Sequence, residues 1–190
     1  PERPLKPANE EIADGKVHDE LEYTWYGRVD DFAILEKATK KIIQRQSSAR
    51  MPNGTIRVRK TIEDGAVSYV ETIKLYGSGG VKKEMPNPTT QAKHEFFMMA
   101  AGESMDKTRF TFPAENGLTW EVDIFTDLDG NFKPYCKVDL EVTEPLTDIP
   151  IPPIKMSEVI FIDPTKGRPP QEIQARIDEL NKGLFVNKVF

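Results

Sequence analysis

The sequence carries pairs of charged residues two positions apart inside strand-like runs. Alternate residues of a β-strand point to the same face, so each run has one charged face and one apolar face. The clearest pairs are Glu20 and Glu22, Arg57 and Arg59, Lys107 and Arg109, Glu121 and Asp123, and Asp139 and Glu141. We therefore predict that charged faces from several strands line one polar cavity. Solvated strand faces with cross-strand salt bridges are the simpler alternative.

Composition describes a charge-rich globular chain, because 38% of its 190 residues are hydrophobic and 30% are charged. The net charge of -5 gives no bulk attraction to nucleic acid, although 26 Lys and Arg residues allow a local basic groove. Cys136 is the only cysteine, which excludes an intramolecular disulfide and a cysteine-based zinc site. No apolar run approaches the roughly 20 residues that span a bilayer, and the N-terminal segment has no apolar signal core. We therefore expect a cytoplasmic protein without membrane contact.

Patterning along the chain predicts strands near residues 18–26, 55–63, 67–76, 105–113, 118–126 and 133–143. Gly27 is expected to break the first strand, and Asp64-Gly65 is typical of a hairpin turn. Residues 91–100 fit a strand or a short helix, and residues 157–162 fit a helical turn or a strand. Helices are predicted over residues 30–46 and from Pro169 or Pro170 to Gly183, whereas residues 81–90 are polar, carry Pro86 and Pro88 and are assigned no element.

Hairpin-connected strands favour a mainly β fold, a closed antiparallel barrel of about eight strands with flanking helices and a C-terminal helical tail. The predicted organisation is a flexible arm over 1–17 and a β-tunnel domain over 18–143. A Pro-rich segment and helix over 144–190 is expected to dock on the same domain.

The ordered charge pairs resemble those of the CYTH superfamily, the triphosphate tunnel metalloenzymes, over about residues 18–143. The similarity lies in the order of an E-x-E strand, an R-x-R strand, a strand ending in Lys, an R-x-E-like strand, a K-x-R strand, a D-x-F strand and a closing acidic pair. The residues that carry it are Glu20 and Glu22, Arg57 and Arg59, Lys74, Lys93 and Glu95, Lys107 and Arg109, Asp123 and Phe125, and Asp139 and Glu141.

The resemblance implies a tunnel that binds a triphosphate together with Mg²⁺ or Mn²⁺. Arginines grip phosphate oxygens with paired hydrogen bonds, and these metals prefer carboxylate oxygens. The implied triphosphate-binding residues are Arg57, Arg59, Lys74, Lys93, Lys107 and Arg109. The implied metal ligands are Glu20, Glu22, Asp139 and Glu141, followed by Asp123 and Glu121. Glu20 and Glu22 are also the implied catalytic residues, because a carboxylate there orients the attacking water.

The sequence departs from the family pattern at two positions that concern catalysis. Thr24 stands where the family has a Lys that helps to activate water, and Phe97 replaces the last acid of R-x-E-x-E. The leading expectation is a metal-dependent triphosphatase acting on a nucleotide, an RNA 5′-end or an organic triphosphate. A catalytically impaired tunnel that binds nucleotide or RNA is the second reading. A protein-interaction module that uses the tail after residue 144 is the third, and cyclase activity is a further alternative.

Overall fold

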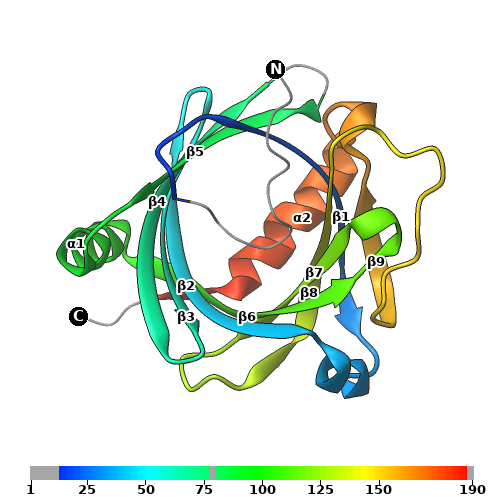
Figure 1. The fold of residues 1–190 in the computed structure, drawn as a ribbon, viewed down its shortest axis with the longest axis horizontal. Coiled ribbons are helices and arrows are strands. Elements are labelled where there is room, and N and C mark those ends of the chain that lie inside the picture. Colours follow the sequence, from blue (N-terminus) through cyan, green and yellow to red (C-terminus); the bar gives the residue numbers. More distant parts are fainter. Residues whose placement is uncertain (1–12, 78–79, 188–190) are drawn as a thin grey trace.

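The computed structural model describes residues 13–77 and 80–187, and within them eight strands close into an antiparallel barrel (Figure 1). Around the barrel the order is β6, β2, β3, β4, β5, β1, β8 and β7, and β7 pairs with β6 to close the ring. The strands are β1 His18–Val29, β2 Lys40–Met51, β3 Gly54–Glu63, β4 Ala66–Tyr76, β5 Lys82–Pro88, β6 Glu103–Pro113, β7 Thr119–Thr126 and β8 Phe132–Val142. The predicted fold class is therefore confirmed.

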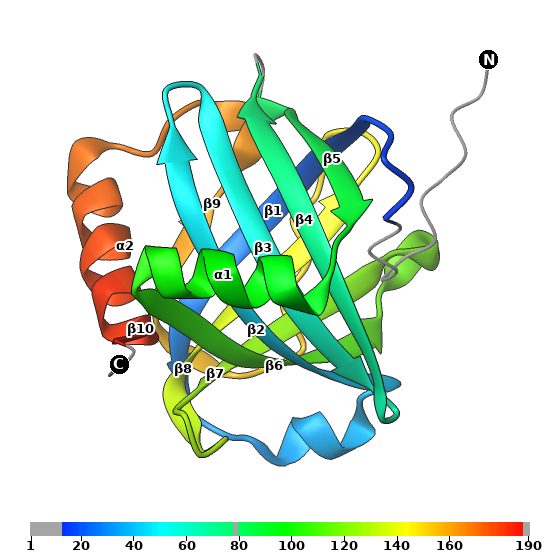
Figure 2. The ribbon, with the colours of Figure 1, turned by 90° about the vertical axis from the view of Figure 1, so that its left-hand side faces the viewer.

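Further elements pack against this ring. Two strands extend its sheet, because β9 pairs with β1 and β10 pairs with β6. The bounds are β9 Met156–Ile162, β10 Phe185–Asn187, α1 Gln91–Ala101 and α2 Gln171–Leu184, with 3₁₀ helices at Ala33–Lys37, Glu115–Gly117 and Pro164–Lys166. Helix α1 lies across the outside of the barrel wall, whereas α2 lies across one end of the barrel (Figures 1 and 2). Among the described residues, no helix has both the length and the apolar character that crossing a membrane requires.

The barrel wall is polar on its inner face and apolar on much of its outer face. Along β1, Glu20 and Glu22 line the interior cavity. Leu21, Tyr23 and Trp25 occupy the opposite face and are buried. Because side chains alternate along a strand, this arrangement places the hydrophobic core outside the ring, between the wall and the segments that cover it.

The segment after β8 covers the apolar outer face of β1, β8 and β7. Ile154 is buried in the same hydrophobic cluster as Trp25 and Trp120, and Leu146 packs against this cluster. The backbone N–H of Leu146 also donates to the Tyr23 hydroxyl at 3.0 Å. The Pro-rich segment therefore completes the core while leaving the barrel interior free for charged side chains.

The helix predicted over residues 30–46 is wrong. A 3₁₀ helix occupies only Ala33–Lys37, and residues from Lys40 onward form β2. The apolar spacing of Leu35 and Ile42 fitted a helix, but β2 is hydrogen-bonded to both β3 and β6. Without it the barrel would have two unpaired edges, so pairing across the sheet overrides the local helical period.

The first predicted strand is longer than expected, since β1 continues through Gly27 to Val29. A Cβ atom at residue 27 would lie 2.9 Å from the Cβ of Met156 on β9. The glycine therefore permits close packing of the β9 side chain instead of ending the strand.

The region of residues 81–90 contains β5, which the sequence did not predict because of Pro86 and Pro88. Only residues 18–20 of β1 pair with β5. The half of β5 that contains the prolines therefore has no β1 strand beside it, and the missing proline N–H groups break no hydrogen bond to β1. The carbonyl of Pro86 instead accepts from the N–H of Gly15 at 2.8 Å.

Residues 91–100 form α1, the helical one of the two predicted alternatives. The Thr90 hydroxyl caps it by accepting from the N–H of Lys93, and Gly102 ends it with a φ of 72°. The second predicted helix is confirmed as α2, in which Ile177 and Leu184 are buried. Most of the predicted arm, residues 1–12, lies outside the described residues.

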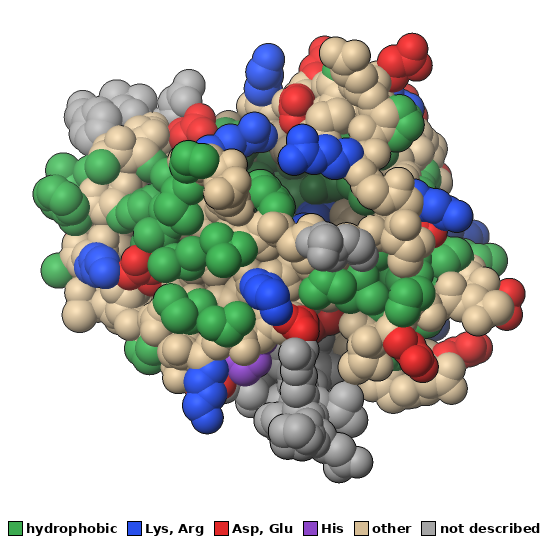
Figure 3. Space-filling view, turned by 90° about the horizontal axis from the view of Figure 1, so that it is seen from above, with side chains coloured by type: hydrophobic (Ala, Val, Ile, Leu, Met, Phe, Trp, Pro, Cys, Tyr) green, Lys and Arg blue, Asp and Glu red, His purple; other side chains and the backbone are tan. Residues whose placement is uncertain are grey.

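Viewed from above, the surface has a hollow with basic side chains beside it and a broad apolar area next to it (Figure 3).

Candidate functional site: a charged tunnel

The barrel encloses a cavity of about 580 Å³, called the tunnel below. Its lining comes from the inward faces of the eight barrel strands and from Asn181 and Phe185 at the end of α2. Lining acids are Glu20, Glu22, Glu63, Glu84, Glu121, Asp139 and Glu141, and lining bases are Arg57, Arg59, Lys74, Lys107, Arg109 and Lys137. The strand order places β1 and β8, which carry most of the acids, across the ring from β2 and β3. The tunnel therefore has an acidic wall on β1 and β8, and the arginines of β3 face this wall across the tunnel.

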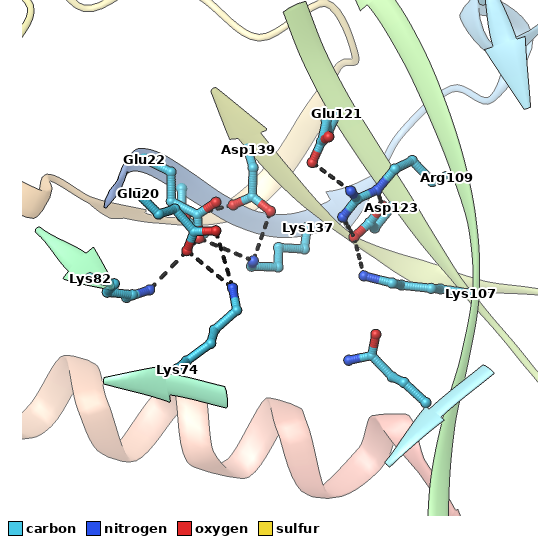
Figure 4. Close-up of polar contacts among 12 residues, drawn as sticks. Glu20, Glu22, Lys74, Lys82, Lys107, Arg109, Glu121, Asp123, Lys137 and Asp139 are labelled. Carbon is cyan, nitrogen blue, oxygen red and sulfur yellow. Dashed lines mark hydrogen bonds and ion pairs between the residues drawn. The ribbon is translucent and has the colours of Figure 1, made fainter. Parts of the chain in front are cut away.

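The acidic wall gathers Glu20, Glu22 and Asp139 on the neighbouring strands β1 and β8 (Figure 4). The ammonium group of Lys74 donates to both carboxylate oxygens of Glu20, at 3.1 and 3.2 Å. The same ammonium lies 3.5 Å from a carboxylate oxygen of Glu84. Lys74 of β4 thus places one positive charge beside Glu20 and Glu84.

Lys137 lies between the two other acids of this wall. Its Nζ donates to Asp139 at 2.7 Å and is 3.9 Å from Oε1 of Glu22. The second oxygen of Asp139 accepts from the Thr24 hydroxyl at 2.6 Å. Thr24, at the position where the family motif has Lys, therefore orients an acid instead of supplying a cation.

Burial and charge shift the ionisation of this cluster. Burial raises the pKa of Asp139 to about 6, with a further increase from the negative charge of Glu22, while Lys137 opposes the shift. Burial alone would lower the pKa of Lys137, but the carboxylates of Asp139 and Glu22 hold it well above its ordinary value. The acidic wall is thus an environment that favours a nearby cation.

The basic wall contains arginines from β3 and a compact charged group on β6 and β7. Nε and Nη2 of Arg59 donate to the Gln46 side-chain oxygen at 2.9 and 2.7 Å. Nη2 of Arg57 donates to the Thr72 hydroxyl at 3.4 Å. Both guanidinium groups are held in place on the tunnel lining, which reduces the conformational entropy lost when they bind an anion.

Asp123 is the buried centre of the charged group on β6 and β7. It accepts two hydrogen bonds from Arg109, at 2.7 and 3.0 Å, and one from Lys107 at 2.5 Å. The remaining Nη1 of Arg109 lies 2.6 Å from Glu121. Although burial alone would raise the pKa of Asp123, the charges of Arg109 and Lys107 hold it far below the usual range.

Lys107 pairs with Asp123, yet its own pKa is lowered to about 7. Burial is the largest cause, and the positive charges of Arg109 and Arg59 add to it, while Asp123 opposes them. An anion placed in the tunnel would favour the protonated form of Lys107.

The structure brings most of the predicted site residues together on the tunnel lining. Those that line it are Glu20, Glu22, Arg57, Arg59, Lys74, Lys107, Arg109, Asp139 and Glu141, together with the second-tier Glu121. Lys93, predicted to bind triphosphate, is not brought to the lining, because it lies on the outer helix α1 and pairs with Glu71 at 2.6 Å. Asp123, also predicted as a metal ligand, does not line the tunnel, and both of its oxygens accept hydrogen bonds from Arg109 and Lys107.

Sequence reasoning missed Lys137 and Glu84. Lys137 continues the alternation of Asp139 and Glu141 along β8, so the period of two that identified the acids also pointed to it. Glu84 lies on β5, where two prolines concealed the strand.

The donor chemistry of the acidic wall fits Mg²⁺ or Mn²⁺, which prefer several carboxylate oxygens. The residues that would hold such an ion are Glu20, Glu22, Asp139 and Glu141. As the described side chains stand, no three acids converge closely enough to form a metal cluster. Ammonium groups lie against Glu20, Glu22 and Asp139 instead.

Several solved structures resemble this chain at low sequence identity. A crystal structure of an inorganic triphosphatase is 19% identical, with 72% of this chain and 87% of that chain covered and a TM-score of 0.44. A protein of Pyrococcus horikoshii is 16% identical, with 88% and 94% covered and a TM-score of 0.46. A Hippeastrum protein with a dominant triphosphatase activity is 12% identical, with 90% and 92% covered and a TM-score of 0.40.

The closed barrel with charges on its inner face confirms the expected resemblance to the triphosphate tunnel metalloenzymes in fold. No protein-family model matches the sequence, and no curated protein matches it. At these identities and TM-scores the neighbours carry no argument about chemistry, which rests below on the tunnel's own side chains.

Proposed function

We propose that this protein is a metal-dependent triphosphatase that holds its substrate inside the tunnel. One observation carries the proposal: a single enclosed cavity presents arginines and lysines opposite a cluster of carboxylates. Polyphosphate binding requires the first group, and metal-assisted hydrolysis requires the second. Strand faces exposed to solvent would show neither the enclosure nor the buried ion pairs.

The basic wall supplies the phosphate grip. Arg57, Arg59 and Arg109 offer planar pairs of N–H donors that match phosphate oxygens, and Lys74 and Lys107 add point charges. Preformed contacts to Gln46 and Asp123 hold Arg59 and Arg109 in position before a ligand arrives. The result is an anion site whose positive charge is already oriented.

The acidic wall supplies the group that orients water. Glu22 is the best placed, because the ammonium groups of Lys82 and Lys137 lie 3.7 and 3.9 Å from its Oε1, beyond ordinary hydrogen-bond distance. Glu20, by contrast, already accepts two hydrogen bonds from Lys74. Glu22 would orient a water in line with the terminal phosphorus and accept its proton as the bond to the bridging oxygen breaks.

A bound Mg²⁺ or Mn²⁺ would neutralise charge that develops on the phosphate oxygens. We propose nucleotides, RNA 5′-ends and organic triphosphates as the substrate classes. Tyr26 lines both the tunnel and a second cavity of about 510 Å³ beneath α2, so space for an organic group adjoins the proposed phosphate site.

The direct test is phosphate release from tripolyphosphate, ATP, thiamine triphosphate and 5′-triphosphate RNA, each with Mg²⁺ or Mn²⁺. We expect turnover that requires the metal, and a loss of at least about 100-fold in Glu20→Gln/Glu22→Gln, since both the metal charge and the oriented water depend on these acids. Glu36→Gln on the exposed 3₁₀ helix is the control. Full activity in the double variant would contradict the assignment of the acidic wall.

A tunnel that binds a nucleotide or RNA without hydrolysing it is the second candidate. Thr24 favours it, because the hydroxyl donates to Asp139 where the family motif has a lysine that helps to activate water. This candidate predicts that triphosphates raise the melting temperature without phosphate release. A melting temperature unchanged by every one of these ligands would count against it.

A further inference from the structure

The ammonium group of Lys137 lies where two acids of the tunnel need a positive charge. It is 2.7 Å from Oδ2 of Asp139 and 3.9 Å from Oε1 of Glu22 (Figure 4). The backbone sets this position, because Lys137 pairs with Tyr26 in the β1–β8 register and Asp139 pairs with Thr24. Lys137 therefore contacts Asp139 on its own strand and approaches Glu22 across the strand pair.

The surroundings make this contact stronger than an ordinary surface ion pair. The side chains of Asp139 and Glu22 are 3% and 15% exposed, and that of Lys137 is 25% exposed. Two carboxylates this poorly hydrated repel each other unless a cation lies near both. Thr24 satisfies one Asp139 oxygen by a hydrogen bond, but its hydroxyl carries no charge.

We propose that Lys137 is a positioning residue, a built-in counter-ion that holds Glu22 and Asp139 in the free tunnel and competes with a divalent cation for their oxygens. The competition rests on the proposed function, because that function places the cation at these carboxylates. A compact ammonium and a divalent cation both seek carboxylate oxygens, and they cannot occupy the same space.

Competition also gives Lys137 a second position. When a divalent cation occupies the carboxylates, the ammonium is repelled and turns toward the tunnel lumen, where the basic wall binds phosphate. Lys137 then supplies the positive charge on the acidic side of the tunnel that Thr24 lacks.

The test measures binding of Mn²⁺ alone to the full chain, without any triphosphate. Mn²⁺ affinity is obtained by calorimetry, and the melting temperature is recorded with and without the ion for the wild type and Lys137→Met. Lys83→Met is the matched control, because Lys83 pairs with another β1 carboxylate, Asp19, at 2.8 Å, and neither residue lines the tunnel.

We expect Lys137→Met to melt at a lower temperature than the wild type without metal, and to be stabilised more by Mn²⁺. Its Kd for Mn²⁺ should fall about tenfold or more, whereas the Lys83→Met value should match the wild type. A side chain with a merely structural role would lower stability without tightening Mn²⁺ binding. Equal Mn²⁺ responses in wild type and Lys137→Met, including no response in either, would overturn the proposal.

Lys137→Gln keeps the proposal testable if Lys137→Met fails to fold, because the amide still donates a hydrogen bond to Asp139 but has no charge. We expect it to bind Mn²⁺ more tightly than the wild type, and unchanged or weaker binding would overturn the proposal. These affinities do not depend on turnover. Absence of phosphate release with the expected Mn²⁺ response would contradict only the proposed hydrolysis.

Discussion

The charged side chains of the basic wall are organised around one buried residue, Asp123. Its two oxygens accept three hydrogen bonds from Lys107 and Arg109. Removing one partner of such a buried network would leave a charge without compensation, which is much more costly than losing a surface pair. Asp123 therefore fixes the direction of two phosphate-binding candidates without touching a phosphate itself.

Lys107 gives this wall a dependence on pH. Burial and the neighbouring arginines lower its pKa to about 7, below its ordinary value of 10.5, so the side chain loses its positive charge as the pH rises through 7. A bound polyanion favours the charged form, and tripolyphosphate binding should therefore take up a proton above pH 7. We expect affinity to decline between pH 6.5 and 8.5 by about tenfold.

Calorimetry in buffers of different ionisation enthalpy measures this proton uptake. Lys107→Met removes the titrating group, so its affinity should be lower but should change less with pH than that of the wild type. Ionisation of tripolyphosphate itself is common to both proteins and cancels in the comparison. An identical pH dependence in the two proteins would show that Lys107 remains charged throughout.

Single residues on the tunnel lining were predictable where an alternating pattern was visible, as for Glu20 and Glu22 or Arg57 and Arg59. The partner of each side chain was not predictable. Asp123 has the same spacing as a metal ligand, and only its burial against Lys107 and Arg109 assigns it another role. The approach of Lys137 to Glu22 likewise depends on the β1–β8 register, which the sequence does not state.

Among the elements, α2 has the clearest structural role, because it closes one end of the barrel (Figure 2). Leu184, at its C-terminal end, is 1% exposed. The ammonium of Lys133 donates to the Gly183 carbonyl at 3.2 Å, which adds a favourable cation to this end of the helix. These contacts place Asn181 and Phe185 on the tunnel lining.

Shortening the buried side chain in Leu184→Ala should lower the free energy of unfolding by about 2–4 kcal/mol, the usual cost of such a cavity. Urea denaturation followed by far-UV circular dichroism measures this change. Leu128→Ala, at a position that is 57% exposed, is the control and should change stability by less than about 0.5 kcal/mol. Similar values for both variants would contradict the docking of α2 through Leu184.

Elements that obey local rules were predicted well. Asp64-Gly65 forms the expected hairpin turn between β3 and β4, with positive φ at both residues, and α2 follows its apolar period. β2 and β5 were missed because they form through pairing with strands that are distant in the sequence, not through local patterning. β2 is needed by both β3 and β6, and β5 tolerates its prolines only because β1 pairs with a short part of it.

At the scale of the whole molecule, the barrel separates two functions of its sequence. Outward side chains pack against α1, β9 and the Pro-rich segment and supply the core, while inward side chains are free to be charged. A net charge of -5 therefore conceals a tunnel lining that carries both acids and bases. The position of the core outside the ring explains why the segment after residue 144, which no charge motif describes, is part of the fold.

The central claim is that this tunnel binds a triphosphate, and calorimetric titration of tripolyphosphate into the full chain tests it most directly. We predict one ligand per chain. The affinity should be at least about 100-fold weaker in Arg57→Met/Arg59→Met, because this variant lacks two guanidinium groups and the charge-assisted hydrogen bonds that they would form with the ligand. Arg50→Met, at an exposed position outside the tunnel lining, should bind like the wild type. Absence of binding, or equal affinity in all three proteins, would contradict the account.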